Sequence, residues 1–238
     1  MTAEVLMIMG TRLDFVLPSD DAPQIWASAR DELVRLDKLF NRFDPSSDVS
    51  KYNAGGAPSA ELADAIRLAL CYRKLTCGLF DIAGGGPCDN GKDGFKGLDF
   101  GGFAKGYALG RIAPMLRGEG VRDAFVSFGG STILAMGRHP SGDSWKVALK
   151  DPYSGLAVEE ISLDEITLST SGNTPAYTGH IVDPRTGKGN FERKMTTALC
   201  PDPLDAEILS TALMLADESE AEIMEKNFPN AELRLYLL

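Results

Sequence analysis

The sequence predicts an α+β fold in which helices flank a mainly antiparallel sheet. Three observations favour it: helical patterns dominate the first half of the chain, strand patterns dominate the middle, and helical patterns return near the end. A regular alternation of strands and helices would instead favour a doubly wound α/β fold. The chain has 238 residues, 44% of them hydrophobic and 24% charged, so it can bury a substantial core.

Strand patterns open the chain, and helical patterns follow. Residues 4–17 predict two strands or one bent strand, with Gly10 as a β-bulge. From Gln24, hydrophobic residues recur every three or four positions, as on the buried face of a helix, and the Asp44-Pro45 pair ends this pattern. A polar turn is expected over 44–56. Two further helices are expected over 60–76, where Ser59 can act as the cap, and over 102–117.

The second half of the chain predicts a run of strands and two closing helices. Its short segments of alternating hydrophobic and polar residues, at regular spacing, are typical of a meandering antiparallel sheet. These strands are expected over 123–130, 132–137, 145–150, 157–163 and 165–169, and two further strands are expected over 195–200 and 232–238. Helices over about 204–217 and 219–227 precede the last strand.

Charge and cysteine content narrow the class of protein. The formal net charge of −10 argues against binding to nucleic acid, which needs a basic surface, but a lysine, backbone amides or a cation can still hold a phosphorylated small molecule. The four cysteines form no CxxC pair, which favours a reduced, intracellular protein. Because we see no signal peptide and no membrane segment, we expect a cytoplasmic protein, although a trimmed exported form would look the same.

The segment 169–189, STSGNTPAYTGHIVDPRTGKG, is the strongest candidate for a ligand-binding loop. It is rich in Ser, Thr and Gly and contains His180, one of only two histidines in the chain. Hydroxyls, an imidazole and tight turns suit a loop that handles a polar ligand. Taken alone, the segment is explained equally well by a surface hairpin with an ordinary histidine.

A second candidate is the glycine-rich segment LDFGGFAKGYALGRI, residues 98–112. Gly101 and Gly102 lead into the predicted helix, and Lys105 stands at its start. Free amides at a helix N-terminus, together with a lysine charge, favour an anion such as phosphate. The segment matches neither the dinucleotide-binding GxGxxG pattern nor a Walker loop, and glycines at helix starts are often structural, so alone it is a weak signal.

Eight motifs in the same order resemble the FAD:protein FMN transferase (ApbE-type) family over nearly the whole chain. They are MGT (9–11), RFDPSSDVSKYN (42–53), GLFDI (78–82), LDFGGFAKGYALGRI (98–112), FGGS (128–131), TSGN (170–173), HIVDPRTGKG (180–189) and AEILSTAL (206–213). The resemblance implies an ApbE-like α/β roll related to the T-fold, formed by residues 1–238 as a single domain or as two intertwined subdomains. It also implies an enzyme that cleaves FAD with Mg²⁺ and transfers FMN to a Thr or Ser hydroxyl of an acceptor flavoprotein, or to water.

The resemblance also assigns roles to individual residues. His180 is the expected general base that takes the proton of the acceptor hydroxyl. Glu207, Thr211 and the carbonyl of Ala104 are the expected Mg²⁺ ligands, and residues 207 and 211 share one helix face. The residues expected to contact FAD are Met9, Asn53, Asp81, Lys105, Gly106, Tyr107, Gly129, Gly130, Thr170, Ser171, Gly172, His180 and Asp183.

Simpler structural roles stay open for several of these residues. Asn53 could cap the helix that follows it, and Asp81 could accept hydrogen bonds from nearby backbone amides. Tyr107 could pack against the sheet. Glu207 could be an ordinary solvated residue of a helix.

The chain departs from the family pattern in four ways. Glu207 stands where the family usually has Asp, and Ser131 replaces the Asp of a G-G-D motif. The spans 81–99 and 171–180 are short, which would open the site to a large acceptor or to water. The lipobox of exported members is missing. Because of the two substitutions, a non-catalytic FAD-binding protein is one alternative to the transferase, and an Mg²⁺-dependent FAD pyrophosphatase is another.

Overall fold

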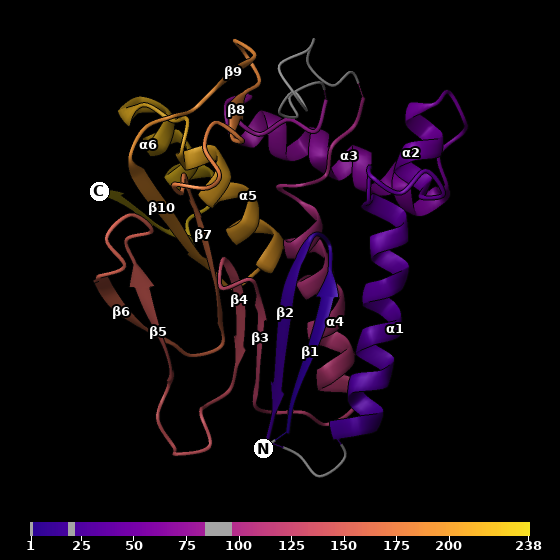
Figure 1. Ribbon diagram of the computed structural model, residues 1–238, viewed down its shortest axis with the longest axis vertical. Coiled ribbons are helices and arrows are strands. Elements are labelled where there is room, and N and C mark those ends of the chain that lie inside the picture. Colours follow the sequence, from indigo (N-terminus) through magenta and orange to yellow (C-terminus); the bar gives the residue numbers. More distant parts are fainter. Residues whose placement is uncertain (1, 19–21, 84–96) are drawn as a thin grey trace.

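Residues 2–18, 22–83 and 97–238 are described by the computed structural model drawn in Figure 1. Their largest element is a seven-stranded sheet in which every neighbouring pair of strands is antiparallel. In spatial order its strands are β1 (Thr2–Ile8), β2 (Thr11–Leu17), β3 (Ala124–Phe128), β4 (Thr132–Met136), β7 (Ile166–Gly172), β10 (Lys194–Cys200) and β11 (Glu232–Leu237). Together with the helices, this sheet confirms the predicted α+β class. The expectation of one domain over residues 1–238 stays a prediction.

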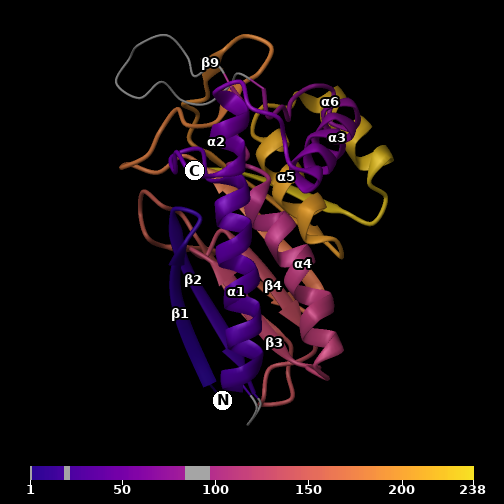
Figure 2. The same cartoon turned by 90° about the vertical axis from the view of Figure 1, so that its right-hand side faces the viewer.

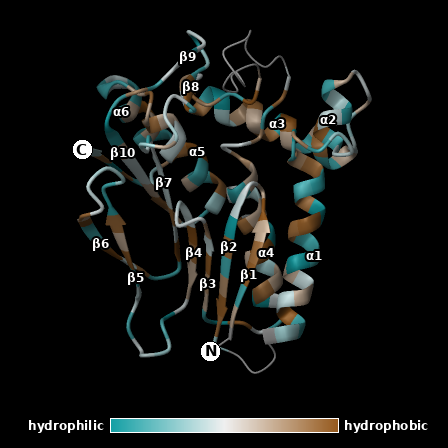
Figure 3. Ribbon diagram, in the orientation of Figure 1, coloured by the Kyte–Doolittle hydropathy of each residue, from teal (hydrophilic) through white to brown (hydrophobic). Residues whose placement is uncertain are grey.

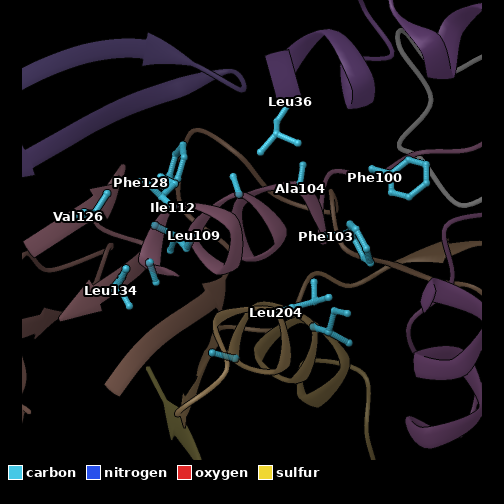
Figure 4. Close-up of a cluster of buried hydrophobic side chains, with 14 of the residues drawn as sticks. Leu36, Phe100, Phe103, Ala104, Leu109, Ile112, Val126, Phe128, Leu134 and Leu204 are labelled. Carbon is cyan, nitrogen blue, oxygen red and sulfur yellow. The ribbon is translucent and has the colours of Figure 1, made fainter. Parts of the chain in front are cut away.

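Helices cover one face of this sheet (Figures 1 and 2). The helices that pack on its strands are mainly α1 (Ala22–Phe40), α4 (Ala104–Gly118) and α5 (Pro203–Leu213). Of the other helices, α2 (Asp48–Asn53) packs on α1, and α3 (Ala60–Leu75) packs on α6 (Glu218–Asn227). Hydrophobic and hydrophilic residues alternate along α1, as they do in a helix with one buried face (Figure 3). The main core lies between the helices and the sheet, and Leu36, Leu109, Ile112 and Phe128 are fully buried in it (Figure 4). None of the described helices is long and apolar enough to cross a membrane.

A separate hairpin packs on the other face of the sheet. Its strands β5 (Trp145–Lys150) and β6 (Ala157–Leu163) pair only with each other among the described residues. Trp145 and Leu163 are buried there against Leu168 and Leu199 of the main sheet. The meander predicted from residue 123 onward therefore holds for β3 and β4, but it is wrong for β5 and β6, because β4 pairs directly with β7. Packing on the free sheet face buries the hydrophobic side of this hairpin, which a place at the sheet edge would not.

Two local predictions are corrected in the first half of the chain. Gly10 is not a bulge: Met9 and Gly10, with φ of 50° and 71°, form the two-residue turn that joins β1 to β2. Two positive φ angles match the right-handed twist of a hairpin. The segment 44–56 contains the short helix α2, because the Ser47 side chain caps it by accepting from the Ser50 amide at 3.1 Å. A further small hairpin, β8 (Val182–Asp183) with β9 (Lys188–Gly189), lies within the candidate loop.

Candidate active site

The close approach of α4 to α5 at Gly106 fixes the geometry of the site. A Cβ atom at Gly106 would lie 2.6 Å from the Pro203 carbonyl oxygen and 2.7 Å from Glu207 Cβ, so no larger residue fits without movement. Gly106, predicted to contact FAD, is therefore required for helix packing. The approach also brings the neighbouring Lys105 against Glu207.

Lys105 and Glu207 form an ion pair inside the protein. Lys105 Nζ lies 2.9 Å from Glu207 Oε1 and donates a second hydrogen bond to Ser131 Oγ at 3.2 Å. The other carboxylate oxygen, Glu207 Oε2, accepts from the Thr132 hydroxyl at 2.5 Å and from the Ser169 hydroxyl at 3.2 Å. The Glu207 side chain is 3% exposed and that of Lys105 is 20% exposed. The reading of Glu207 as a solvated helix residue is therefore wrong.

Hydroxyl groups from β7 and α5 continue this polar cluster. Ser210 Oγ lies 2.9 Å from Ser169 Oγ and 3.0 Å from Ser171 Oγ, and Ser171 Oγ lies 3.3 Å from Thr211 Oγ1. Side chains alternate along a strand, so Ser169 and Ser171 face α5 while Thr170 faces the other side of the sheet. The Thr170 amide nevertheless donates to the Ser131 carbonyl at 2.7 Å, which ties β7 to the β3–β4 turn.

The β1–β2 and β3–β4 turns meet beside this cluster. Gly129 and Gly130, with φ of 58° and 72°, form the second turn, directly before Ser131. A Cβ atom at Gly129 would lie 2.4 Å from Thr11 Oγ1, so the two turns pack tightly. Met9, in the first turn, donates its amide to Asp37 Oδ1 at 3.2 Å. The structure thus brings Met9, Gly129 and Gly130 to the side of the site from which Ser131 contacts Lys105.

The loop that carries His180 is held by Asn173 and by two glycines. Asn173 is buried and donates to the carbonyls of Asn190 and Glu192 at 2.9 and 3.0 Å, while its Oδ1 accepts from the Gly179 amide at 3.1 Å. A Cβ atom at Gly189 would lie 2.6 Å from the Gly179 carbonyl oxygen. These contacts fix Gly179, and they therefore also fix the position of the next residue, His180.

His180 is half-buried and suited to act as a base. Its ring stacks on the Tyr177 ring with centroids 4.2 Å apart, and its buried Nδ1 has no hydrogen-bond partner in the part of the chain that is described. Burial lowers the pKa of His180 below its ordinary value; a contact with the Tyr177 backbone raises the pKa by less, and the positive charge of Lys105 lowers it further. The imidazole is therefore mostly neutral near pH 7.

Three predicted FAD contacts lie apart from this cluster. The Tyr107 hydroxyl donates to Glu61 Oε1 at 3.3 Å, and its ring packs on Phe103 of the helical layer, not on the sheet as the simpler reading had it. Asp81 forms an ion pair with Arg73 at 2.7 Å. Asp183 accepts from the amide and the guanidinium of the nearby Arg185, which holds the pKa of its carboxyl below the usual range.

Asn53 ties α2 to the segment before α4. Its side chain donates to the Leu98 carbonyl at 3.0 Å and accepts from the Leu98 amide at 2.8 Å, so it does not cap the following helix, whose cap is Ser59. A hollow of about 620 Å³, with Tyr52 and Gly56 in its lining, lies beside this contact. Gly172, the last residue of β7, pairs with Met195, and an added Cβ would lie 3.2 Å from the Lys194 carbonyl oxygen.

Sequence reasoning missed several residues of the cluster. Thr132, Ser169 and Ser210 were not proposed as site residues, although each contacts Glu207. Asn173 belongs to the TSGN motif, but the motif assigns it no role. The signal that could have found Ser169 is its spacing of two from Ser171, which places both on one face of a strand.

The residues expected to bind Mg²⁺ do not fit this ion as they are arranged. Both oxygens of Glu207 are engaged by Lys105, Thr132 and Ser169. The Thr211 hydroxyl donates to the Glu207 carbonyl at 3.1 Å. Among the described residues, no group of three or more His, Cys, Asp or Glu side chains could hold a metal ion. An ion at Glu207 would also lie next to the Lys105 ammonium, which repels it.

Comparison with known proteins decides the family. The ApbE family model matches residues 9–91 and 89–235. The chain belongs to the ApbE family. An FAD:protein FMN transferase of Rhodobacter capsulatus is 30% identical over 202 residues, which cover 80% of this chain and 38% of that protein. One of Klebsiella pneumoniae is 30% identical over 126 residues, 49% of this chain and 38% of that protein. This ApbE chain thus aligns with well under half the length of these curated relatives.

Solved ApbE structures share the fold. The flavin transferase ApbE from Vibrio cholerae superposes with a TM-score of 0.81 at 20% identity, covering 99% of this chain and 93% of that chain. The ApbE protein from Thermotoga maritima gives a TM-score of 0.78 at 21% identity, covering 98% and 93%. The family and fold that the motifs predicted are therefore confirmed.

Proposed function

We propose that this ApbE family member cleaves FAD and transfers FMN to a Thr or Ser hydroxyl of an acceptor protein. The observation that carries the proposal is the partly exposed ammonium of Lys105, held at the start of α4 by Glu207 and Ser131, in a chain whose His180 imidazole can act as a base. Cleavage of a pyrophosphate needs positive charge near its oxygens and a base near the attacking hydroxyl. The names of the Rhodobacter and Klebsiella relatives support the same chemistry.

The start of α4 supports an anion site next to Lys105. No side chain caps this 15-residue helix. The Ala104 amide donates to the Phe100 carbonyl at 2.8 Å, so the later amides of the first turn and the positive end of the dipole are what a ligand could use. An ammonium has three N–H groups, and within the described residues those of Lys105 meet only Glu207 and Ser131. The third can contact a phosphate oxygen. These features suit the pyrophosphate of FAD.

The residues suggest a single displacement step. The acceptor oxygen forms a bond to the phosphorus of the FMN half, and the bond between this phosphorus and the bridging oxygen breaks. AMP leaves with that electron pair. His180 receives the proton of the acceptor hydroxyl, and Lys105 holds negative charge on the pyrophosphate. With water in place of the acceptor, the same step releases FMN and AMP.

The family pattern also predicts that Mg²⁺ takes part, through Glu207, Thr211 and the Ala104 carbonyl. The contacts of Glu207 argue against an ion at this position, so magnesium dependence stays a prediction to be tested. No step above requires the ion.

The decisive experiment follows FAD and its products. The purified protein is incubated with FAD and with a panel of protein domains that carry exposed Thr or Ser residues, once with Mg²⁺ and once with EDTA. AMP release, together with a covalent flavin on one acceptor, is the expected result. His180→Gln should slow AMP release by about 10²–10⁴-fold, since it removes the general base.

Other outcomes assign other functions. FMN and AMP released without any acceptor would identify a pyrophosphatase. FAD that binds but stays intact under all conditions would refute the transferase proposal and leave a flavin-binding protein.

A further inference from the structure

The two substitutions that set this chain apart from its family pattern meet at one atom. Glu207 replaces Asp and Ser131 replaces the Asp of G-G-D, and they stand 76 positions apart in the sequence by their numbers. In the structure both contact Lys105 Nζ, Glu207 at 2.9 Å and Ser131 at 3.2 Å. The substitutions therefore change the surroundings of one ammonium group together.

The longer side chain of Glu207 reaches across from α5 to three other elements. Its carboxylate meets Lys105 on α4, Thr132 on β4 and Ser169 on β7. An Asp would hold its carboxylate about 1.5 Å nearer to α5, one carbon–carbon bond shorter. Thr132 and Ser169 are fully buried, so the Glu207 carboxylate is enclosed on the strand side and balanced by a cation on the helix side.

Because residue 131 is a serine, the ammonium has a single carboxylate partner among the described residues. The Ser131 hydroxyl accepts from Lys105 and donates to the Phe128 carbonyl at 3.0 Å, so it orients the ammonium without adding charge. An Asp here would give Lys105 a second negative neighbour and would repel a phosphate. Among the described residues, one carboxylate balances the ammonium, and the exposed side of the ammonium stays open to an anion.

From this geometry we infer that Glu207 is a positioning residue, the fixed counterion of Lys105. On this inference, Lys105 supplies to the pyrophosphate the positive charge that the family pattern assigns to a divalent cation at residue 207. The inference rests on the proposed function for the identity of the anion. A divalent ion at Glu207 would have to displace the ammonium from an enclosed carboxylate, so this chain should bind such an ion weakly there.

The first test measures metal binding without any substrate. Mn²⁺ is titrated into the protein, and free Mn²⁺ is followed by electron paramagnetic resonance. Wild type should bind Mn²⁺ no better than Glu207→Gln does. Lys105→Met removes the competing ammonium, so it should bind Mn²⁺ at least about tenfold more tightly than wild type, and the double variant K105M/E207Q should lose this gain. Lys150→Met, on the distant β5 strand, is the matched control and should match wild type.

Two results would overturn the inference at this stage. One is Mn²⁺ binding by wild type that Glu207→Gln abolishes, which would make Glu207 a metal ligand. The other is unchanged Mn²⁺ affinity in Lys105→Met, as expected if Glu207 were merely structural. If Lys105→Met does not fold, Glu207→Asp takes its place: the shorter carboxylate withdraws from Lys105, and Mn²⁺ affinity should again rise at least about tenfold.

The second test uses FAD cleavage in EDTA and in Mg²⁺. Wild type should keep its rate within about twofold when Mg²⁺ is removed, whereas Lys105→Met in EDTA should lose about 10²-fold or more. Loss of cleavage in EDTA with FAD binding unchanged would overturn the inference and leave the proposed function standing. Absence of cleavage in every condition would refute the proposed function, while the Mn²⁺ titrations would still decide the role of Glu207.

Discussion

Replacing Gly106 by alanine tests whether the helix contact fixes the site. The new Cβ would lie 2.6 Å from the Pro203 carbonyl oxygen, about 0.8 Å closer than the 3.4 Å at which ordinary contacts begin. Its neighbours are backbone and Cβ atoms of α5 and cannot swing away, so α4 and α5 must separate. Overpacking of this kind destabilises by about 1–3 kcal/mol, and the higher helix propensity of alanine returns about 0.5–1 kcal/mol. We expect a net loss of about 1 kcal/mol.

The same helix offers a matched control at Gly110. An added Cβ there meets no atom within 4 Å, so Gly110→Ala should stabilise the protein by about 0.5–1 kcal/mol through helix propensity alone. Urea denaturation measures both free energies of unfolding. Thermal unfolding should show the Gly106→Ala midpoint lower by about 2–4 °C, at about 2–4 °C per kcal/mol for a chain of this size. Equal stabilisation by both alanines would refute the argument that Gly106 sets the distance between the helices.

Two further predictions concern His180. Gly189→Ala would place a Cβ 2.6 Å from the Gly179 carbonyl oxygen and displace the His180 loop, so kcat should fall by about 10²-fold. Gly118→Ala, where an added Cβ meets open space, is the control. An unchanged kcat in Gly189→Ala would contradict the role of this contact. Because the pKa of His180 is lowered, activity should fall with decreasing pH only below about pH 6.5. Stability has the same sign: the unfolded chain takes up a proton first, so the contribution of His180 is intact above about pH 6.5 and is lost as the pH falls through its lowered pKa. A loss of activity that already begins above pH 7 on acidification would contradict this assignment. So would a Lys105→Met variant that loses activity at the same pH as wild type, because removal of the Lys105 charge should raise the pKa of His180.

Local patterns were enough to predict most helices and strands. The strands expected over 145–150 and 157–163 have these bounds in the structure, because alternation along a strand is a local property. The same alternation does not say which sheet a strand joins, so the separate β5–β6 hairpin could not be predicted. Helix α2, with six residues, is too short to show a helical period and depends on the Ser47 cap.

The motifs predicted part of the polar cluster but not its arrangement. They named Lys105, Ser171 and Thr211, which the structure places in one cluster between α4, α5 and β7. The same motifs brought forward Tyr107, which stands two residues from Lys105 and so points to nearly the opposite side of α4. Its hydroxyl is bonded to Glu61, away from the ion pair. A motif records which residues lie near each other along the chain, whereas the helical period decides which of them face the same ligand.

The two substitutions show most clearly what a linear comparison cannot reveal. Taken one at a time, Glu207 and Ser131 look like independent losses of a metal ligand and of a carboxylate, which favours an inactive protein. Their shared contact with Lys105 changes that interpretation. The Glu207 carboxylate extends to the Lys105 ammonium, and a neutral hydroxyl replaces the second carboxylate at residue 131. Together these changes give a largely buried ion pair of zero net charge. The Ser131 change is needed for this balance, since an additional Asp beside Glu207 would leave an excess negative charge in a largely enclosed cluster. The pair therefore argues for a preserved cationic site that depends on a lysine, and against the loss of function that each substitution alone would suggest.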